Sequence, residues 1–447
     1  MGKPLYALAI KAASFEIDQI APKPLVLNSQ RNLPGRPLVP VAVSPDAVPP
    51  VFAGTVARPA ARVDYVDALR VFLTLLVVGH HAWEPYAFSY MPPEIVLPGP
   101  PVPGVWAFLA VNAAFFMGLF FLLAGYYTPG SLERKGPAQF LYDRLTRIGL
   151  PLLMGLLLIA PLQGWMRMNL SPGLLRIGYW EYLTQGFFGI GGKPDGWPAS
   201  QYWPQLNLGH LWFLQHLLIY AMLYAAWRLL APPRWIGATR PAPPSHWMIF
   251  GYAVALAAAT IIIRIWYPMN DWIALLGFIQ MEPAHLPQYA SLFVIGLVAS
   301  HGRWIETMPT SRGLVWLVIG GGLAALLYVL AGFRILEPGT PVGGVGGIDL
   351  KWTLWEAFTA TGLCVGLPVA FRELALGAGR AWRILARNAF AIYVFHFPFV
   401  LLVQWALMET LFPKWVSLLL AWPLAVVVTV MFTNYVILRL PGLRRIF

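Results

Sequence analysis

The chain has 447 residues, of which 58% are hydrophobic and only 11% are charged, and its mean hydropathy is +0.63. Because a soluble domain carries about 25% charged residues, this composition excludes an ordinary soluble protein and indicates an integral membrane protein. The formal net charge of +12 does not indicate a nucleic-acid partner, because the cations are spread over many short loops instead of forming one basic block.

Residues 1–61 are rich in proline and contain no long apolar run. We expect a disordered cytoplasmic tail there, with an over-extended start site as the alternative. From residue 62 to residue 447 we expect one transmembrane domain. The only cysteine, Cys364, excludes an intrachain disulfide and a two-cysteine metal site, and no metal is expected.

Ten apolar runs follow, most of them near the length of about 20 residues that a membrane-crossing helix needs. The sequence therefore predicts an all-α fold, a polytopic membrane helical bundle of about ten transmembrane helices. The sixth run is short, and residues 272–280 before it are expected to form a re-entrant or interfacial piece. The predicted helices cover residues 66–86, 105–127, 148–166, 209–230, 247–267, 288–300, 313–333, 352–371, 385–407 and 416–438.

The distribution of Lys and Arg between the loops predicts the orientation of the bundle. With the N-terminus in the cytoplasm, the inner loops and the C-terminal tail hold sixteen Lys and Arg, and the outer loops hold six. Cytoplasmic loops carry the excess of positive charge in membrane proteins. Both termini are therefore expected in the cytoplasm.

The first predicted helix carries Arg70 near its inner end and His81 farther along, with His80 beside it. Arg70 and His81 are separated by roughly 16 Å along a helix axis. Ionisable groups inside a membrane usually mark a pathway or a site. His81 is suited to act as a general base because the imidazole titrates near neutral pH. In the alternative, Arg70 extends to the inner headgroups and His81 makes a structural hydrogen bond.

Arg144 and Arg147 lie in the second inner loop, where the third helix begins. Residues three apart share one face of an α-helix, so the two guanidiniums are predicted to form a fork for phosphate oxygens. The alternative is the ordinary positive charge of a cytoplasmic loop.

Three further positions carry polar groups within apolar runs. His210 and Trp212 lie at the outer mouth of the fourth helix and are expected on the acceptor side, with an interface anchor as the alternative for Trp212. Glu356, near the outer end of the eighth helix, either orients an imidazole or pairs with Arg264. His396, in the middle of the ninth helix, is either catalytic or bonded to a neighbouring helix.

Taken together, these motifs resemble acyltransferase family 3, the multispanning O-acyltransferases. The likeness covers roughly residues 62–438, and Ala124 stands where the family often has Ser. Within the family the chain looks most like the glucan biosynthesis protein C branch, which is associated with succinylation of periplasmic glucans. The motifs that match the family as a whole are Asp67 to Arg70 with His81, Phe120 to Tyr126, Arg144-x-x-Arg147, His210-x-Trp212 and Asn388 to His396. The motifs that match the branch are Thr128-Pro-Gly, Arg134 to Pro137 and Trp212 to His216.

The resemblance implies that the donor is a cytosolic acyl-CoA, used as a substrate, with no permanently bound cofactor. The acceptor would be a hydroxyl of an extracytoplasmic glycan or a related molecule, and the protein would lie among the lipids of the bacterial inner membrane. Arg144 and Arg147 would bind the CoA phosphates. Acetyl and succinyl groups both fit, and Arg264 is a candidate partner of a dicarboxylic acyl chain by its charge alone.

The resemblance also implies roles inside the membrane. Arg70 would guide the pantetheine or the thioester. His81 would take the proton from the acceptor hydroxyl or carry the acyl group briefly. Glu356 or His396 would orient His81.

A proton-coupled secondary transporter is the alternative function, because buried Arg, His and Glu side chains also suit proton-coupled transport. Many transporters consist of two related halves. Residues 66–230 and 247–438 show no such pairing of their hydropathy, which favours the enzyme.

Overall fold

The computed structural model describes residues 64–87, 97, 100–171, 174–199, 201–231, 240–333, 335, 350–374 and 379–447. The predicted tail at 1–61 lies outside these residues. Within the described ranges the chain is helical apart from one two-stranded hairpin, so the predicted all-α membrane bundle is confirmed.

The long helices are each built from one or more uninterrupted apolar runs. They are α2 (Asp64–Trp83), α3 (Val105–Lys135), α8 (Trp212–Leu230), α9 (His246–Arg264), α10 (Leu286–Gly302), α12 (Thr310–Gly332), α13 (Leu350–Glu373), α14 (Arg380–Met408) and α15 (Lys414–Tyr435).

A tenth long segment, residues 137–170, is one continuous crossing of mixed type. It runs through α4 (Pro137–Arg144), the π-helical turn η2 (Leu145–Gly149), α5 (Leu150–Met154), a second π-helical turn η3 (Gly155–Ile159) and α6 (Ala160–Leu170).

Short elements connect the long helices: η1 (Glu84–Tyr86), α7 (Tyr179–Glu181), η4 (Tyr182–Phe187), η5 (Gly209–Leu211), η7 (Pro283–His285), α11 (Trp304–Thr307), η8 (Ile437–Arg439) and η9 (Leu443–Arg445).

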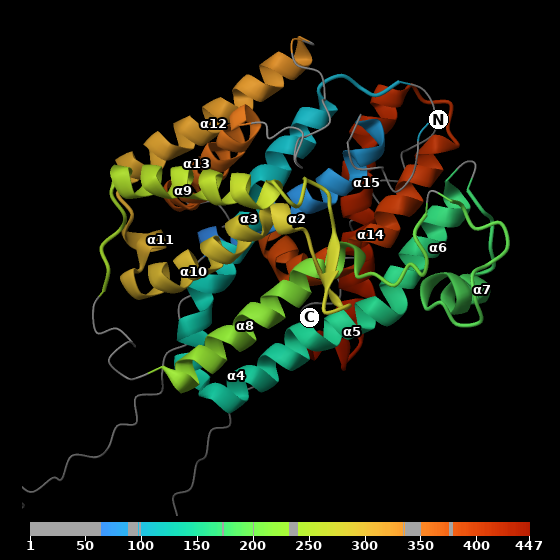
Figure 1. Ribbon diagram of the computed structural model, residues 1–447, viewed down its shortest axis with the longest axis horizontal. Coiled ribbons are helices and arrows are strands. Elements are labelled where there is room, and N and C mark those ends of the chain that lie inside the picture. Colours follow the sequence, from blue (N-terminus) through green and yellow to red (C-terminus); the bar gives the residue numbers. More distant parts are fainter. Residues whose placement is uncertain are drawn as a thin grey trace, which may run out of the picture. The chain divides into compact units, whose positions relative to one another are not determined.

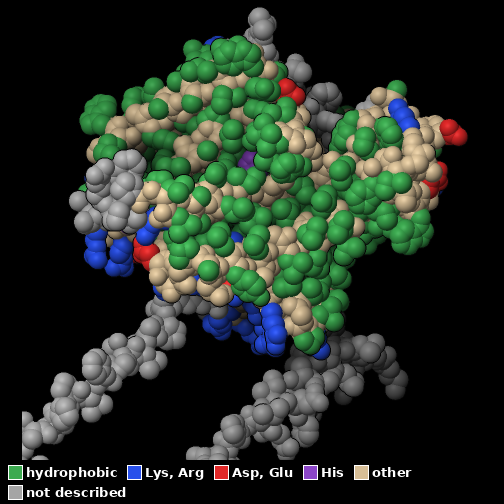
Figure 2. All heavy atoms as spheres, turned by 60° about the horizontal axis from the view of Figure 1, so that its bottom comes forward, with side chains coloured by type: hydrophobic (Ala, Val, Ile, Leu, Met, Phe, Trp, Pro, Cys, Tyr) green, Lys and Arg blue, Asp and Glu red, His purple; other side chains and the backbone are tan. Residues whose placement is uncertain are grey.

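In the described ranges, nine of the long segments are long and apolar enough to cross a membrane. The remaining one is α10, which has 17 residues and corresponds to the short sixth predicted helix. The protein is therefore an integral multi-pass membrane protein. Figure 2 shows a face covered largely by hydrophobic side chains, with Lys and Arg gathered along one edge. An apolar surface of this kind suits contact with lipid.

Helices α2 and α3 lie at the centre of residues 62–447. They pass between the group formed by α9, α12 and α13 and the pair formed by α14 and α15 (Figure 1). The first predicted helix is thus enclosed by other helices.

Glycines allow the closest crossings: a Cβ on Gly125 of α3 would lie 2.1 Å from the Phe293 carbonyl oxygen of α10. Such small residues let membrane helices pack backbone to backbone.

The predicted interfacial piece at 272–280 is a hairpin of β1 (Ile273–Leu275) and β2 (Ile279–Met281). Gln215 of α8 holds it by donating to the Phe278 carbonyl at 2.9 Å and accepting from the Gln280 backbone N–H at 2.9 Å. His216 donates to the Gln280 carbonyl at 3.0 Å. The hairpin is therefore fixed to the start of α8, where His210 and Trp212 lie.

Candidate functional site

His81 lies in the last turn of α2, and Glu84 follows it in η1. The Nδ1 atom of His81 lies 3.3 Å from Oε2 of Glu84, and Oε1 of the same carboxylate lies 3.6 Å from Nε2 of His80. Residues three and four apart meet on one face of a helix, which brings both imidazoles to one carboxylate. The side chain of His81 is 21% exposed, so its ring remains accessible.

His396 and His210 complete a cluster of imidazoles around His81. The rings of His81 and His396 are stacked with their centroids 5.5 Å apart, and the ring of His210 lies 4.8 Å from that of His396. The ring of Phe397 contacts both His81 and His210. The structure thus unites three of the predicted site residues from α2, η5 and α14, which are far apart in sequence. We call His81, His210 and His396 the imidazole cluster.

Hydrogen bonds assign the protons within the imidazole cluster. His396 donates from Nδ1 to the Tyr393 carbonyl at 2.8 Å, and among the described residues its buried Nε2 has no hydrogen-bond partner. His210 donates from Nε2 to the Val394 carbonyl at 3.0 Å. A neutral imidazole carries one N–H and one lone pair, so His396 presents a bare lone pair inside the cluster.

Side chains on neighbouring helices hold the end of α2 in place. Gln404 of α14 donates from Nε2 to the backbone carbonyl of His81 at 2.7 Å. Gln163 of α6 lies 3.3 Å from Nδ1 of His210. These amides fix the backbone on which His81 stands and the ring of His210.

Arg70 lies near the beginning of α2, away from the imidazole cluster. Its guanidinium is 3.6 Å from the carboxylate of Asp67, and the side chain is 51% exposed. The spacing along α2 separates Arg70 from His81 by roughly 16 Å. The structure therefore places Arg70 at an accessible end of the same helix and not beside His81.

Arg144 and Arg147 are separated by a change of helix type. Arg144 ends α4 and packs over the ring of Phe140, with 4.8 Å from Cζ to the ring centroid, whereas Arg147 lies in η2 and is exposed. One side chain is half-buried and the other is exposed, so the two guanidiniums stand in different surroundings, and the phosphate fork stays a prediction. Their place at one end of the long mixed segment is as predicted.

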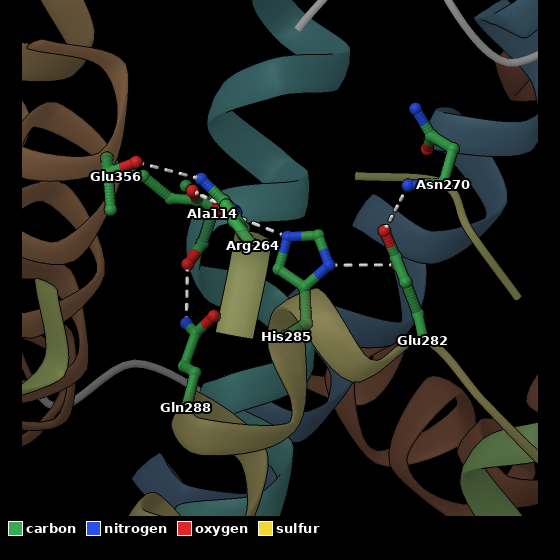
Figure 3. Close-up of polar contacts among 8 residues, drawn as sticks. Ala114, Arg264, Asn270, Glu282, His285, Gln288 and Glu356 are labelled. Carbon is green, nitrogen blue, oxygen red and sulfur yellow. Dashed lines mark hydrogen bonds and ion pairs between the residues drawn. The ribbon is translucent and has the colours of Figure 1, made fainter. Parts of the chain in front are cut away.

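Glu356 lies in a different group of charges. It accepts from Arg264 Nη2 at 2.6 Å and from His285 Nε2 at 2.8 Å, and His285 Nδ1 lies 2.8 Å from Glu282. Figure 3 shows the His285 ring between the two carboxylates. No hydrogen bond or ion pair within the described ranges joins Glu356 to His81. We call Arg264, Glu282, His285 and Glu356 the charge network.

The charge network is closed to solvent. Only 1% of the Arg264 side chain is exposed, and the adjoining cavity of about 10 Å³ has room for a single water molecule. Burial alone would lower the pKa of His285, but Glu282 and Glu356 raise it to about 10. Each ring nitrogen lies 2.8 Å from a carboxylate oxygen, and Arg264 is neutralised by Glu356 and unavailable to a dicarboxylic acyl chain.

Trp212 faces the charge network more closely than the imidazole cluster. Its ring stacks on Tyr289 at 5.3 Å between centroids, and Tyr289 in turn stacks on His285 at 5.8 Å. Trp272, just before the hairpin, packs edge-on against Trp212 at 5.6 Å. His210 and Trp212, both expected on the acceptor side, thus point to different groups.

Comparison with known proteins decides the family. A family model described as an acyltransferase domain, Acyl_transf_3, matches residues 63–436. The chain belongs to acyltransferase family 3.

Two relatives of this acyltransferase are named "Glucans biosynthesis protein C" and come from Salmonella gallinarum and Salmonella heidelberg. Each is 24% identical to it over 61% of this chain and 67% of the relative. No solved structure matches the acyltransferase significantly. The family confirms acyl transfer as the general chemistry, which the secondary-transporter alternative does not supply.

One neighbour of His81 in this acyltransferase was missed in the sequence. Glu84 was given no role on the basis of the sequence, although a carboxylate three residues after a histidine on a helix is a recognisable signal. The sequence instead indicated Glu356 as the carboxylate that could orient His81, because Glu356 stands within an apolar run. Among the described residues, no group of three or more His, Cys, Asp or Glu side chains is placed to hold a metal ion.

Proposed function

We propose that this acyltransferase moves an acyl group from cytosolic acyl-CoA to a hydroxyl of an extracytoplasmic glycan, in the bacterial inner membrane. The observation that carries the proposal is the imidazole cluster at the end of α2. His81 lies in it with an accessible ring, on a helix whose other end carries Arg70. The relatives named "Glucans biosynthesis protein C" support a glycan as the acceptor.

In the proposed reaction, Nε2 of His81 is the general base. His81 donates from Nδ1 to Glu84, which leaves the Nε2 lone pair to accept the proton of the acceptor hydroxyl. The hydroxyl oxygen forms a bond to the thioester carbonyl carbon, and the carbon–sulfur bond breaks. CoA leaves as the thiolate and takes up the proton that His81 received, so the products are an ester and free CoA.

The proposed donor path begins at the cationic end of the bundle. Arg147 is exposed and Arg144 lies half-buried beside it, so both suit the phosphates of CoA. Arg70 is accessible on α2 and suits the segment of the donor that leads toward His81. The cations bind the donor, while the imidazole supplies the proton transfer.

The test replaces His81 by Ala. We expect acyl transfer to fall by about 10²–10⁴-fold, the usual contribution of general-base catalysis. Inside-out membrane vesicles receive isotope-labelled acetyl-CoA or succinyl-CoA, and labelled ester is measured in the glycan fraction. His246→Ala, at an exposed position at the start of α9, is the matched control and should retain activity. Full activity of the His81 variant would refute the proposal.

A further inference from the structure

The geometry points to Glu84 as the positioning residue of the His81 base, in place of Glu356 or His396. This inference rests on the proposed function, because it concerns how that base is held. It names a residue for which neither the sequence motifs nor the family likeness gave a role.

The first support is the contact itself. Glu84 Oε2 lies 3.3 Å from His81 Nδ1, and the Glu84 side chain is only 12% exposed. An ionised carboxylate can only accept hydrogen bonds, so the proton of a neutral His81 is held on Nδ1. The lone pair is then on Nε2, the nitrogen that must receive the proton of the acceptor hydroxyl.

The second support is that Glu84 lies between two imidazoles. Its other oxygen, Oε1, lies 3.6 Å from Nε2 of His80. The ring of His80 packs against Phe116 of α3 at 5.3 Å between centroids. The carboxylate is therefore enclosed next to His81, with His80 on its other side.

The other two candidates for this role are excluded by their contacts. Glu356 is bonded to Arg264 and His285. His396 directs its Nδ1 proton to the Tyr393 carbonyl and presents a lone pair on Nε2, so it offers no negative charge to an imidazolium. A carboxylate stabilises the positive charge that His81 gains when it accepts a proton. Among the described residues, Glu84 is the only carboxylate in contact with His81.

The charged and titratable groups that face His81 are Glu84 and His80 on its own side, His396 from α14, and His210 from η5 beyond it. Glu84 is the only acidic group among them. Replacing it by a neutral amide should make a protonated His81 less stable, so the base should stay free to more acidic pH. The acid limb of the pH–rate profile should then move to lower pH.

The test compares Glu84→Gln with Glu84→Asp in the vesicle assay. Glu84→Gln should lower kcat by about 10²-fold, at an unchanged KM for acetyl-CoA, and move the acid limb to lower pH. Glu84→Asp should restore part of the rate, and the acid limb of its pH–rate profile should return to the position it has in the parent protein. Glu133→Gln, with a side chain that is 52% exposed, is the matched control and should behave like the parent protein.

A second variant separates this role from a structural one. Glu356→Gln should reduce the amount of folded protein without moving the acid limb. An unchanged kcat and limb in Glu84→Gln, or a moved limb in Glu356→Gln, would overturn the inference while the proposed function stands. Full activity of the His81→Ala variant would overturn both this inference and the proposed function.

Discussion

The imidazole cluster and the charge network are two groups of titratable side chains that lie beside α3. Phe116 of α3 packs on His80 beside the first, and Gln288 next to the second donates to the Ala114 carbonyl of α3 at 2.6 Å. In the charge network, both nitrogens of His285 face carboxylates and Arg264 is neutralised.

In the imidazole cluster, by contrast, the ring of His81 stays accessible. Partnered charges hold helices together, whereas an accessible lone pair can accept a proton. The comparison therefore assigns structure to one group and chemistry to the other, although composition alone would rank the charged group first.

The largest effect should come from leaving one charge of the network unpaired. Arg264→Leu removes the guanidinium and leaves Glu356 with only the imidazole of His285, in a network with one excess negative charge. Breaking a buried ion pair from one side costs about 3–5 kcal/mol. We expect a marked loss of thermal stability, measured as the apparent Tm of the detergent-purified protein.

The matched control for this prediction is the double variant Arg264→Leu with Glu356→Leu. It removes one positive and one negative charge together and leaves His285 paired with Glu282. Its apparent Tm should lie above that of the single variant. A double variant less stable than the single one would show that the network is not held by paired charges.

A smaller effect is expected at the other end of the protein, where the cations are accessible. Replacing Arg144 and Arg147 together by Ala should raise the KM for acyl-CoA by about tenfold and leave kcat nearly unchanged, since a charged hydrogen bond contributes about 1.5–3 kcal/mol. Initial rates over a range of donor concentrations measure both constants. A fall in kcat at unchanged KM would place these residues in the chemical step instead.

The smallest effect should be a pH dependence of stability from the charge network. The pKa of His285 is raised from 6.5 to about 10, because Glu282 and Glu356 outweigh the opposing effect of burial. Its stabilising contribution is complete below pH 6.5 and is lost as the pH rises through about 10. The apparent Tm should decline across this window, and His285→Gln should flatten the decline.

The sequence predicted the helices and much of the imidazole cluster for physical reasons. An apolar run of membrane length forms a helix because its backbone polar groups must bond to each other inside the bilayer. The helices α2, α3 and α14 therefore follow from composition. The sequence could not show that His210 and His396 meet His81, because the contact depends on how three separated helices pack. It placed Glu356 near Arg264 by charge alone, and it did not reveal that His285 completes the group.

The pair Arg144 and Arg147 shows a different limit. The spacing of three residues could not reveal that a π-helical turn begins between them or that only Arg147 is exposed. Glu84 shows the reverse case, since its contact with His81 is local and follows from helical spacing.

The two π-helical turns η2 and η3 have a consequence for chain length. Between Arg144 and Gln163, the helix contains both widened turns, and Gln163 must still meet His210 at 3.3 Å. A deletion of one residue in an α-helical part of this crossing would rotate everything after it by about 100° and swing the Gln163 amide away from the histidine. A π-helical turn that lost one residue could instead return to α-helical form and leave the amide in place. The two turns are therefore the positions in this crossing where a change of chain length should be tolerated best.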